Sequence, residues 1–187
     1  FMECYHGILS MDHIINGALT IQGKTIDFTN GRGYIEKDWG QSFPSAYFWM
    51  QTNHFSVPGI SLKASVANIP WLGSSFTGFI AGIWLHDRLI QFTTYNGTRL
   101  LRSFADSRHV QLVMDNKNYR LEILAHREAV SQLASPISGF MTVRIEESMT
   151  SRIEVCLIDK KTNTIILKDT GRNAGLEVAG EIKEITI

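Results

Sequence analysis

Two carboxylates, Glu36 and Asp38, stand two positions apart in a ten-residue segment that begins at Gly31 and reads Gly-Arg-Gly-Tyr-Ile-Glu-Lys-Asp-Trp-Gly. In an extended strand alternate side chains point to one face, so the pair shares a face with Arg32 and Tyr34. Glu36 and Asp38 then lie roughly 7 Å apart along the strand. In an apolar cavity, two carboxylates this close keep one proton between them at neutral pH and can donate it. The spacing predicts acid catalysis by Glu36, Asp38 and Tyr34.

The segment that follows carries aromatic and amide side chains at the same period of two. Trp49, Gln51 and Asn53 alternate along the stretch 46–55 and fall on one face of a strand. Large apolar area with a few orienting polar groups is typical of a ligand cavity. Indole rings can also stabilise a developing carbocation through their π faces. The predicted ligand-binding residues are Arg32, Trp39, Trp49, Gln51 and Asn53.

Two plainer interpretations of these residues stay open. A strand face that carries Arg, Glu and Asp is usually solvated and holds only weak ion pairs. Tryptophans are more often core residues than ligand contacts. Glu36 and Asp38 can also serve as a structural junction, with the neighbouring Gly-Arg-Gly and Trp-Gly steps acting as bulges or corners.

Composition excludes several classes of function. The 187 residues contain 18 Lys and Arg against 18 Asp and Glu, which disfavours a bulk electrostatic grip on nucleic acid. No apolar run reaches the roughly 18 residues that a membrane-spanning helix needs. The six histidines show no metal-ligand spacing on a helix, so no metal or other cofactor is expected. Two cysteines, Cys4 and Cys156, make no disulfide scaffold and favour a reducing, cytoplasmic location.

The chain contains short apolar runs separated by turn signals, which predicts an all-β protein. The expected strands include 60–69, 76–85, 109–114, 119–125, 141–147 and 152–158. Asn16-Gly17, Asn30-Gly31 and Asn96-Gly97 are typical hairpin or turn residues. Segments such as 152–158 alternate apolar and polar residues with period two, as half-buried antiparallel strands do. The best helix candidate is Glu128 to Ala134, where a short apolar stripe ends before Pro136. Regularly spaced strands favour a sandwich or barrel.

The central segment resembles the tocopherol cyclase family and its bacterial relatives. The resemblance rests first on Gly31 to Gly40, then on Phe43-Pro44 and on Trp49-Met50-Gln51-Thr52-Asn53-His54-Phe55. Weaker matches are spread over nearly the whole chain: Met2 to Gly7 with Ser10 to His13, Ile69-Pro70-Trp71, Phe92 to Tyr95, Ala174 to Glu177, and Gly180.

The resemblance implies a fold larger than this chain, with two lipocalin-like antiparallel β-barrels in tandem, as in carotenoid hydratase-like proteins. Residues 1–40 would then supply the last strands of an incomplete N-terminal barrel, and residues 41–187 would form the C-terminal barrel. Strand edges left exposed by an incomplete barrel favour the pairing of two copies as a homodimer.

The resemblance also implies a reaction. The plant enzymes close a chromanol ring on a prenylated hydroquinone, by protonating an alkene and capturing the cation with a phenol oxygen, without a redox cofactor or metal. We therefore expect a hydrophobic, isoprenoid or prenyl-quinol-like ligand and acid-catalysed cyclisation or hydration. On this analogy Glu36 or Asp38 is the acid, with Tyr34, Trp39 and Trp49 around the cation. A non-catalytic lipocalin-like carrier of an apolar ligand is the alternative.

Overall fold

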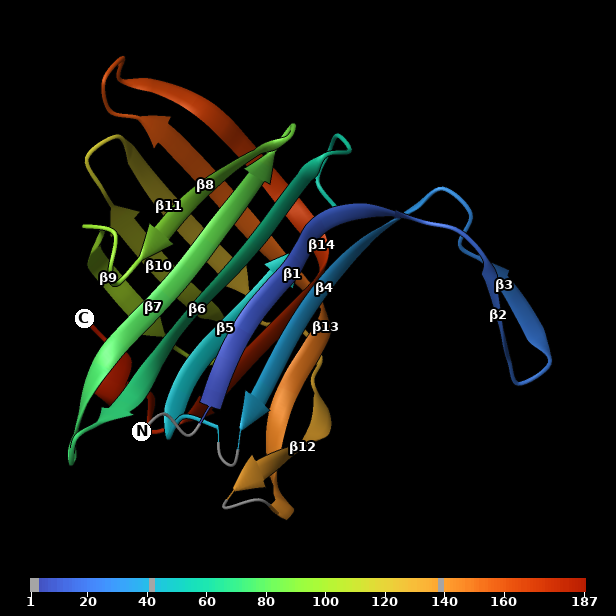
Figure 1. The fold of residues 1–187 in the computed structure, drawn as a ribbon, viewed down its shortest axis with the longest axis horizontal. Coiled ribbons are helices and arrows are strands. Elements are labelled where there is room, and N and C mark those ends of the chain that lie inside the picture. Colours follow the sequence, from blue (N-terminus) through green and yellow to red (C-terminus); the bar gives the residue numbers. More distant parts are fainter. Residues whose placement is uncertain (1–3, 41–42, 138–139) are drawn as a thin grey trace.

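A computed structural model describes residues 4–40, 43–137 and 140–187, and most of them lie in antiparallel β-strands (Figure 1). The chain order is β1 (Cys4–Ile15), β2 (Ala18–Ile21), β3 (Lys24–Asp27), β4 (Gly31–Gly40), β5 (Ala46–Thr52), β6 (Ile60–Trp71), β7 (Ser74–Leu85), β8 (Arg88–Thr93), β9 (Arg99–Ala105), β10 (His109–Asp115), β11 (Tyr119–His126), β12 (Ser131–Ile137), β13 (Phe140–Asp159), β14 (Thr164–Gly180) and a short 3₁₀ helix, η1 (Ile182–Ile185). The all-β prediction is confirmed.

Ten strands form one curved sheet that wraps around the core (Figure 1). Its order is β8-β7-β6-β5-β14-β13-β11-β10-β9, and β12 pairs with β13 beside this path. Within the described part of the chain no ladder joins β8 to β9, the two ends of the path. A closed lipocalin-like barrel therefore stays a prediction.

Period-two alternation sends one set of side chains into the core and the other outward. On β5, Phe48 and Met50 are fully buried in the core, and on β6 Leu62, Ala64 and Val66 are buried beside them. Burying these apolar side chains is the main stabilisation of the sheet, at about 1.5–3 kcal/mol for each large one. The odd-numbered residues of β5 and β6 face away from this core. A second layer covers part of that outer face.

The second layer is the hairpin-like pair of β1 and β4, a two-stranded sheet separate from the large one. In Figure 1 this pair lies beside β5 and runs nearly along the direction of β5 and β6, and β1 contacts β6. The register of β1 shifts between Ile8 and Ser10 and again between Ser10 and His13, whereas β4 stays regular. Side chains from two layers thus meet over the outer face of the large sheet. The division at residue 40 into two barrels stays a prediction.

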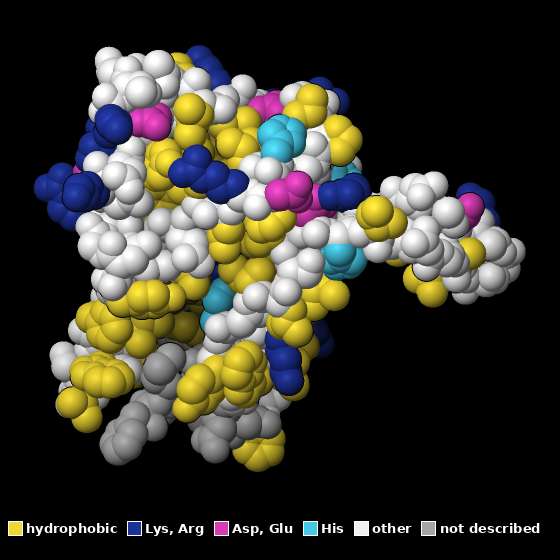
Figure 2. Space-filling model, turned by 45° about the horizontal axis from the view of Figure 1, so that its top comes forward, with side chains coloured by type: hydrophobic (Ala, Val, Ile, Leu, Met, Phe, Trp, Pro, Cys, Tyr) yellow, Lys and Arg dark blue, Asp and Glu magenta, His cyan; other side chains and the backbone are white. Residues whose placement is uncertain are grey.

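The strands β2 and β3 form a small arm that projects from the end of the β1–β4 pair (Figure 1). Leu19 pairs with Ile26 on one face of the arm, and Thr20 pairs with Thr25 on the other. Every residue of both strands is exposed. Figure 2 shows this arm extending from the body, with hydrophobic side chains at its surface.

The helix predicted for Glu128 to Ala134 is wrong. Ser131–Ile137 is strand β12, which pairs antiparallel with β13 from Ser131 opposite Glu147 onward. A three-residue apolar stripe is a weak helix signal, and the edge of a neighbouring strand offers this segment a full ladder of hydrogen bonds. None of the described residues belongs to a helix long and apolar enough to cross a membrane.

Candidate functional site

Glu36 lies at the centre of a polar cluster between the β1–β4 pair and the large sheet. On β4, two positions before it, Tyr34 donates its hydroxyl hydrogen to Glu36 Oε2. From β5, Trp49 Nε1 lies 2.9 Å from Oε1 and 3.0 Å from Oε2 of the same carboxylate. The Glu36 side chain is only 7% exposed. Tyr34 and Trp49 therefore hold one buried carboxylate from two different layers.

His6 of β1 joins the cluster because it stands opposite Asp38 in the β1–β4 ladder. Its Nδ1 contacts Asp38 Oδ1 in a short hydrogen bond and lies 2.9 Å from Glu36 Oε1. One imidazole nitrogen is thus placed between two carboxylates. A carboxylate that fixes one ring nitrogen of a histidine sets the orientation of the ring and leaves the other nitrogen for a different partner.

Lys63 supplies a positive charge beneath the carboxylates. It is fully buried on β6, its Nζ donates to Ser65 Oγ at 2.6 Å, and it lies 3.7 Å from Glu36 Oε1. Burial lowers the pKa of Lys63 to about 8, although Glu36 and Asp38 act in the opposite direction. Lys63 and Glu36 therefore form a buried ion pair. Removing either side chain would strongly destabilise the fold, because the other charge would stay buried without its nearest counter-charge.

The direction of the pKa shifts in the cluster indicates which groups are charged. Burial tends to raise the pKa of Glu36, but His6, Lys63 and the Tyr34 hydroxyl together hold it below its usual range. Burial tends to lower the pKa of His6, but hydrogen bonds with Asp38 and Glu36 raise it overall. Burial and the Glu36 charge raise the pKa of Tyr34, which stays a neutral donor. Glu36 is therefore ionised at neutral pH, and a proton shared in this cluster resides on another group.

A third carboxyl group, Glu177 of β14, lies beside this cluster. It stands opposite Trp49 in the β5–β14 ladder, and Tyr47 donates its hydroxyl hydrogen to Glu177 Oε2 at 2.8 Å. Burial raises the pKa of Glu177 to about 7, and the nearby charges of Glu147, Asp38 and Glu36 act in the same direction. Glu177 is thus a carboxyl group that keeps its proton for part of the time near neutral pH.

The remaining predicted residues are distributed around the cluster. Arg32 pairs with Asp12, its Nε lying 2.8 Å from Oδ1, and its backbone carbonyl accepts from Asn53 Nδ2 at 3.3 Å. Gln51 follows Trp49 on the outer face of β5, and its Nε2 is buried without a hydrogen-bond partner. Arg32, Asn53 and Gln51 therefore border the cluster but make no direct bond to Glu36 that the structure records.

Trp39 lies away from the cluster. It is 47% exposed and stacks on Tyr5, with ring centroids 5.6 Å apart and planes inclined by 14°. Lys37 Nζ lies 5.4 Å from the centre of the same indole. Because alternate residues of a regular strand point to opposite faces, Trp39 and Glu36 cannot share one. The structure thus brings Tyr34, Glu36, Asp38 and Trp49 together and leaves Trp39 outside.

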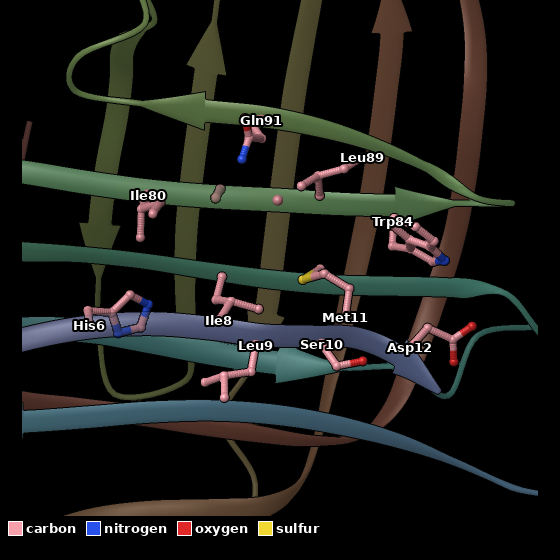
Figure 3. Close-up of a pocket in the computed structure, with 12 residues that line it drawn as sticks. His6, Ile8, Leu9, Ser10, Met11, Asp12, Ile80, Trp84, Leu89 and Gln91 are labelled. Atoms are coloured by element: carbon pink, nitrogen blue, oxygen red, sulfur yellow. The ribbon is translucent and has the colours of Figure 1, made fainter. Parts of the chain in front are cut away.

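A cavity of ≈ 420 Å³ adjoins the cluster at His6. It lies between β1 and the outer face of β7 and β8, and Figure 3 shows His6 at one end and Asp12 at the other. Its apolar lining comes from Ile8, Leu9, Met11, Ile80, Ala81, Trp84 and Leu89, and its polar lining from His6, Ser10, Asp12 and Gln91. The volume and the mixture of apolar walls with a few polar groups are typical of a small-molecule site.

Several buried polar atoms of this region have no hydrogen-bond partner. Among the described residues these include His6 Nε2, Gln51 Nε2 and Ser61 Oγ, on β1, β5 and β6. A buried polar atom without a partner costs about 1–3 kcal/mol, so native proteins contain few of them. Of these three residues, His6 is the one that also lines the cavity.

The cluster also has the donor types that bind metal cations. Ligand atoms of His6, Glu36 and Asp38 lie within 4.8 Å of one another. Lys63 Nζ, 3.7 Å from Glu36, already compensates the carboxylate charge from below. An ordinary divalent cation would compete there with a buried ammonium and with the proton of His6, which favours proton chemistry over metal binding.

Sequence reasoning missed three members of this site: His6, Lys63 and Glu177. His6 and Glu177 both fall inside segments that resemble the tocopherol cyclase family, but neither forms a local motif with Glu36. Lys63 offered a clearer signal, because a lone charged residue stands within the apolar run from Ile60 to Ile69. Such a residue is buried only when it is paired.

Comparison with known proteins supports the resemblance to the tocopherol cyclase family. The tocopherol cyclase-like family matches residues 3–180. A probable chloroplastic tocopherol cyclase of Oryza sativa subsp. japonica is 25% identical over 190 residues, and a chloroplastic tocopherol cyclase of Zea mays is 26% identical over 192 residues. Both alignments cover 96% of this chain and 40% of the relative, so the chain spans less than half the length of these relatives. The chain belongs to the tocopherol cyclase-like family.

Proposed function

We propose that this protein handles a hydrophobic, prenyl-quinol-like molecule and catalyses acid-dependent cyclisation or hydration of its alkene. The observation that carries the proposal is the shared residue His6, which belongs both to the carboxylate cluster and to the lining of the cavity. Proton-carrying groups therefore adjoin an apolar space of ≈ 420 Å³. The names of the two plant relatives support the same class of reaction.

The proposed reaction needs a proton donor and a proton acceptor. In ring closure, the donor's hydrogen forms a new C–H bond at one alkene carbon and leaves a cation at the more substituted carbon. A phenol oxygen of the same molecule bonds to that cation, and the phenol proton returns to the site, so that no net proton is consumed. With Glu36 ionised, the donor is the hydrogen-bonded pair of Asp38 and His6, because His6 lines the cavity and Glu177 does not.

The surroundings suit a cationic transition state. The Trp49 indole, the Tyr34 ring and the ionised Glu36 carboxylate gather at one point between the two layers. Aromatic faces and a fixed negative charge both stabilise a developing carbocation. Tyr34 serves as a neutral donor that positions Glu36, while Arg32, Gln51 and Asn53 do not belong to the lining of the cavity. The exposed Trp39 has no assigned contact in this reaction.

The test is turnover of a geranyl-substituted hydroquinone, followed by chromatography and mass spectrometry. We expect wild-type protein to form an isomer of unchanged mass by ring closure, or a product heavier by one water by hydration. Asp38→Asn and Glu36→Gln should abolish the product while circular dichroism retains the β spectrum. Arg120→Gln, which alters an exposed ion pair with Glu122 away from the cluster, is the matched control and should keep full turnover. Equal turnover in all three variants would contradict the proposal.

The second candidate is a non-catalytic carrier of an apolar ligand. It is favoured by the number of bonds that hold Glu36, because a carboxylate bound by Tyr34, Trp49 and His6 is well placed to be a fixed structural element. A carrier binds the geranyl hydroquinone and returns it unchanged. The chloroplastic location in the names of the plant relatives belongs to those proteins, and the cytoplasmic location of this chain stays a prediction.

A further inference from the structure

The two ring nitrogens of His6 have different surroundings, and this difference bears on how a ligand would bind. His6 Nδ1 is held by Asp38 and Glu36, while Nε2 is buried and has no hydrogen-bond partner. In Figure 3 the second ring nitrogen points along β1 toward Ile8 and the cavity. An imidazole fixed at one nitrogen by carboxylates presents the other as a donor of defined direction.

Two other polar lining residues, Asp12 and Ser10, already have hydrogen-bond partners. Asp12 is paired with Arg32, and the Ser10 hydroxyl is bonded to His13 Nδ1 at 3.0 Å. Among the described residues that line the cavity, the buried side-chain atom left without a partner is His6 Nε2. His6 Nε2 is thus the buried polar atom that needs a partner at one end of the cavity, and the exposed Gln91 side chain is a second polar group on the β8 side.

The rest of the cavity is suited to a chain of apolar atoms. Between His6 and Asp12, six positions apart on β1, a strand extends about 20 Å at most, and the bulges of β1 shorten this span. Met11 stands beside Ile8 on β1, and Trp84 and Leu89 come from β7 and β8 (Figure 3). Apolar walls of this length fit an extended hydrocarbon tail and offer its carbon atoms no polar partner.

We propose that the cavity binds an amphiphile in one orientation, with a hydroxyl or phenol oxygen on His6 Nε2 and its apolar tail along Met11, Trp84 and Leu89. This inference rests on the proposed function and adds to it the residue that contacts the head group and the direction of the ligand. The Ile8 side chain stands beside the ring nitrogen, which is buried, so the ligand oxygen reaches Nε2 only when this side chain moves. His6, through Nε2, is then the residue that selects an oxygen-bearing head over a plain hydrocarbon.

The test compares two probes that differ by one hydroxyl group, 4-dodecylphenol and dodecylbenzene. Binding is followed by tryptophan fluorescence, since Trp84 lines the cavity. We expect the wild-type protein to bind the phenol at least tenfold more tightly, as a hydrogen bond to a charged group contributes that much. His6→Phe keeps an aromatic ring without nitrogens and should bind both probes with similar affinity. His126→Phe, which alters a histidine paired with Glu154 elsewhere, should keep the preference.

The outcomes separate this inference from the proposed function. If neither probe binds the wild-type protein, the cavity is not a ligand site and both proposals fail. If both probes bind equally well to the wild-type protein, the cavity remains a ligand site and the role of His6 is contradicted. Should His6→Phe fail to fold, titration of ¹⁵N-labelled wild-type protein decides the matter, because the phenol must shift the His6 Nε2 resonance and dodecylbenzene must not.

Discussion

The indole N–H of Trp49 donates to both oxygens of the Glu36 carboxylate, at 2.9 and 3.0 Å, and so ties the β1–β4 pair to the large sheet. Trp49 belongs to β5 and Glu36 to β4, which lie in different sheets. The Trp49 ring itself occupies the space above Gly175 of β14, where a side chain would collide with it. The position of the Glu36 carboxylate therefore depends on Trp49, and the position of the Trp49 ring depends on the absence of a side chain at Gly175.

Gly175→Ala should displace Trp49 and weaken its bond to Glu36. A Cβ at this position would lie 2.8 Å from Trp49 Cζ3, which forces the indole to move. We expect a loss of about 1–3 kcal/mol in the free energy of unfolding, typical of overpacking. Urea unfolding measures it. Because Gly175 acts through Trp49, adding Gly175→Ala to Trp49→Phe should cost much less than Gly175→Ala alone. Full additivity of the two changes would contradict this coupling.

Glu36→Gln should destabilise the protein by removing the nearer of the two carboxylates that compensate the buried charge of Lys63. Lys63 is fully buried and lies 3.7 Å from the carboxylate that would be lost. Removing one partner of a buried pair costs about 3–5 kcal/mol. Calorimetry or urea unfolding at pH 7 gives the value.

The double variant Glu36→Gln with Lys63→Met provides the decisive comparison. Replacing both partners removes the buried charge, so the double variant should be more stable than Glu36→Gln alone. Glu154→Gln, at an exposed ion pair with His126, should change stability by less than about 1 kcal/mol. A double variant no more stable than Glu36→Gln would show that Lys63 and Glu36 do not depend on each other.

The stability of the protein should depend on Glu177 between about pH 4.5 and pH 7. The pKa of this group is raised from 4.5 to about 7 in the folded protein, so the native state binds more protons than the unfolded state in this window. The free energy of unfolding therefore falls as the pH rises. Glu177→Gln, which imitates the protonated form, should be more stable than wild type at pH 8 and lose this advantage at pH 4. Glu181→Gln, at an exposed position, should show no such trend. Parallel curves for wild type and Glu177→Gln would contradict the prediction.

His6 should titrate above its ordinary pKa, and Asp38→Asn should lower that value. The groups that act on His6 are Asp38, Glu36 and Lys63, and the hydrogen bonds of the two carboxylates outweigh burial and the lysine charge. A histidine with a raised pKa stabilises the fold fully below its unfolded pKa of about 6.5, and this contribution is lost as pH rises through the folded value. NMR titration of the histidine Cε1 resonances, assigned with His6→Phe, measures both values. An unchanged His6 titration in Asp38→Asn would contradict the short bond between them.

Local pattern was enough to predict most of the fold. Alternation and turn residues indicated strands at 60–69, 76–85, 109–114 and 119–125, and the structure places β6, β7, β10 and β11 there. The segments 141–147 and 152–158 were expected as two strands but form one, β13, because β14 continues the ladder past the gap between them. Whether two neighbouring segments join into one strand depends on the strands they pair with, which lie too far away in the sequence for a local pattern to show.

The site was predictable as a strand face but not as an assembly. Alternation alone places Tyr34, Glu36 and Asp38 together on β4. The sequence does not show that β1 brings His6 to Asp38, or that β6 brings Lys63 beneath Glu36, since 32 and 27 positions separate these pairs. The charge state followed from those partners. From the sequence alone Glu36 is a candidate acid, whereas in the structure His6 and Lys63 keep it an ionised carboxylate.

The central claim is that a hydrophobic molecule occupies the cavity between β1 and the outer face of β7 and β8, and blocking the cavity tests it most directly. A Cβ added at Gly82 would lie 3.3 Å from Leu89 Cδ1 and 3.8 Å from Met11 Cε, so the side chain of Gly82→Leu extends into this space without touching Glu36 or Asp38. The measurement is equilibrium binding of the geranyl hydroquinone by tryptophan fluorescence. We predict that wild type binds it and that Gly82→Leu, folded by circular dichroism, loses at least tenfold in affinity. Equal affinity in the two proteins would place the ligand elsewhere and contradict the account.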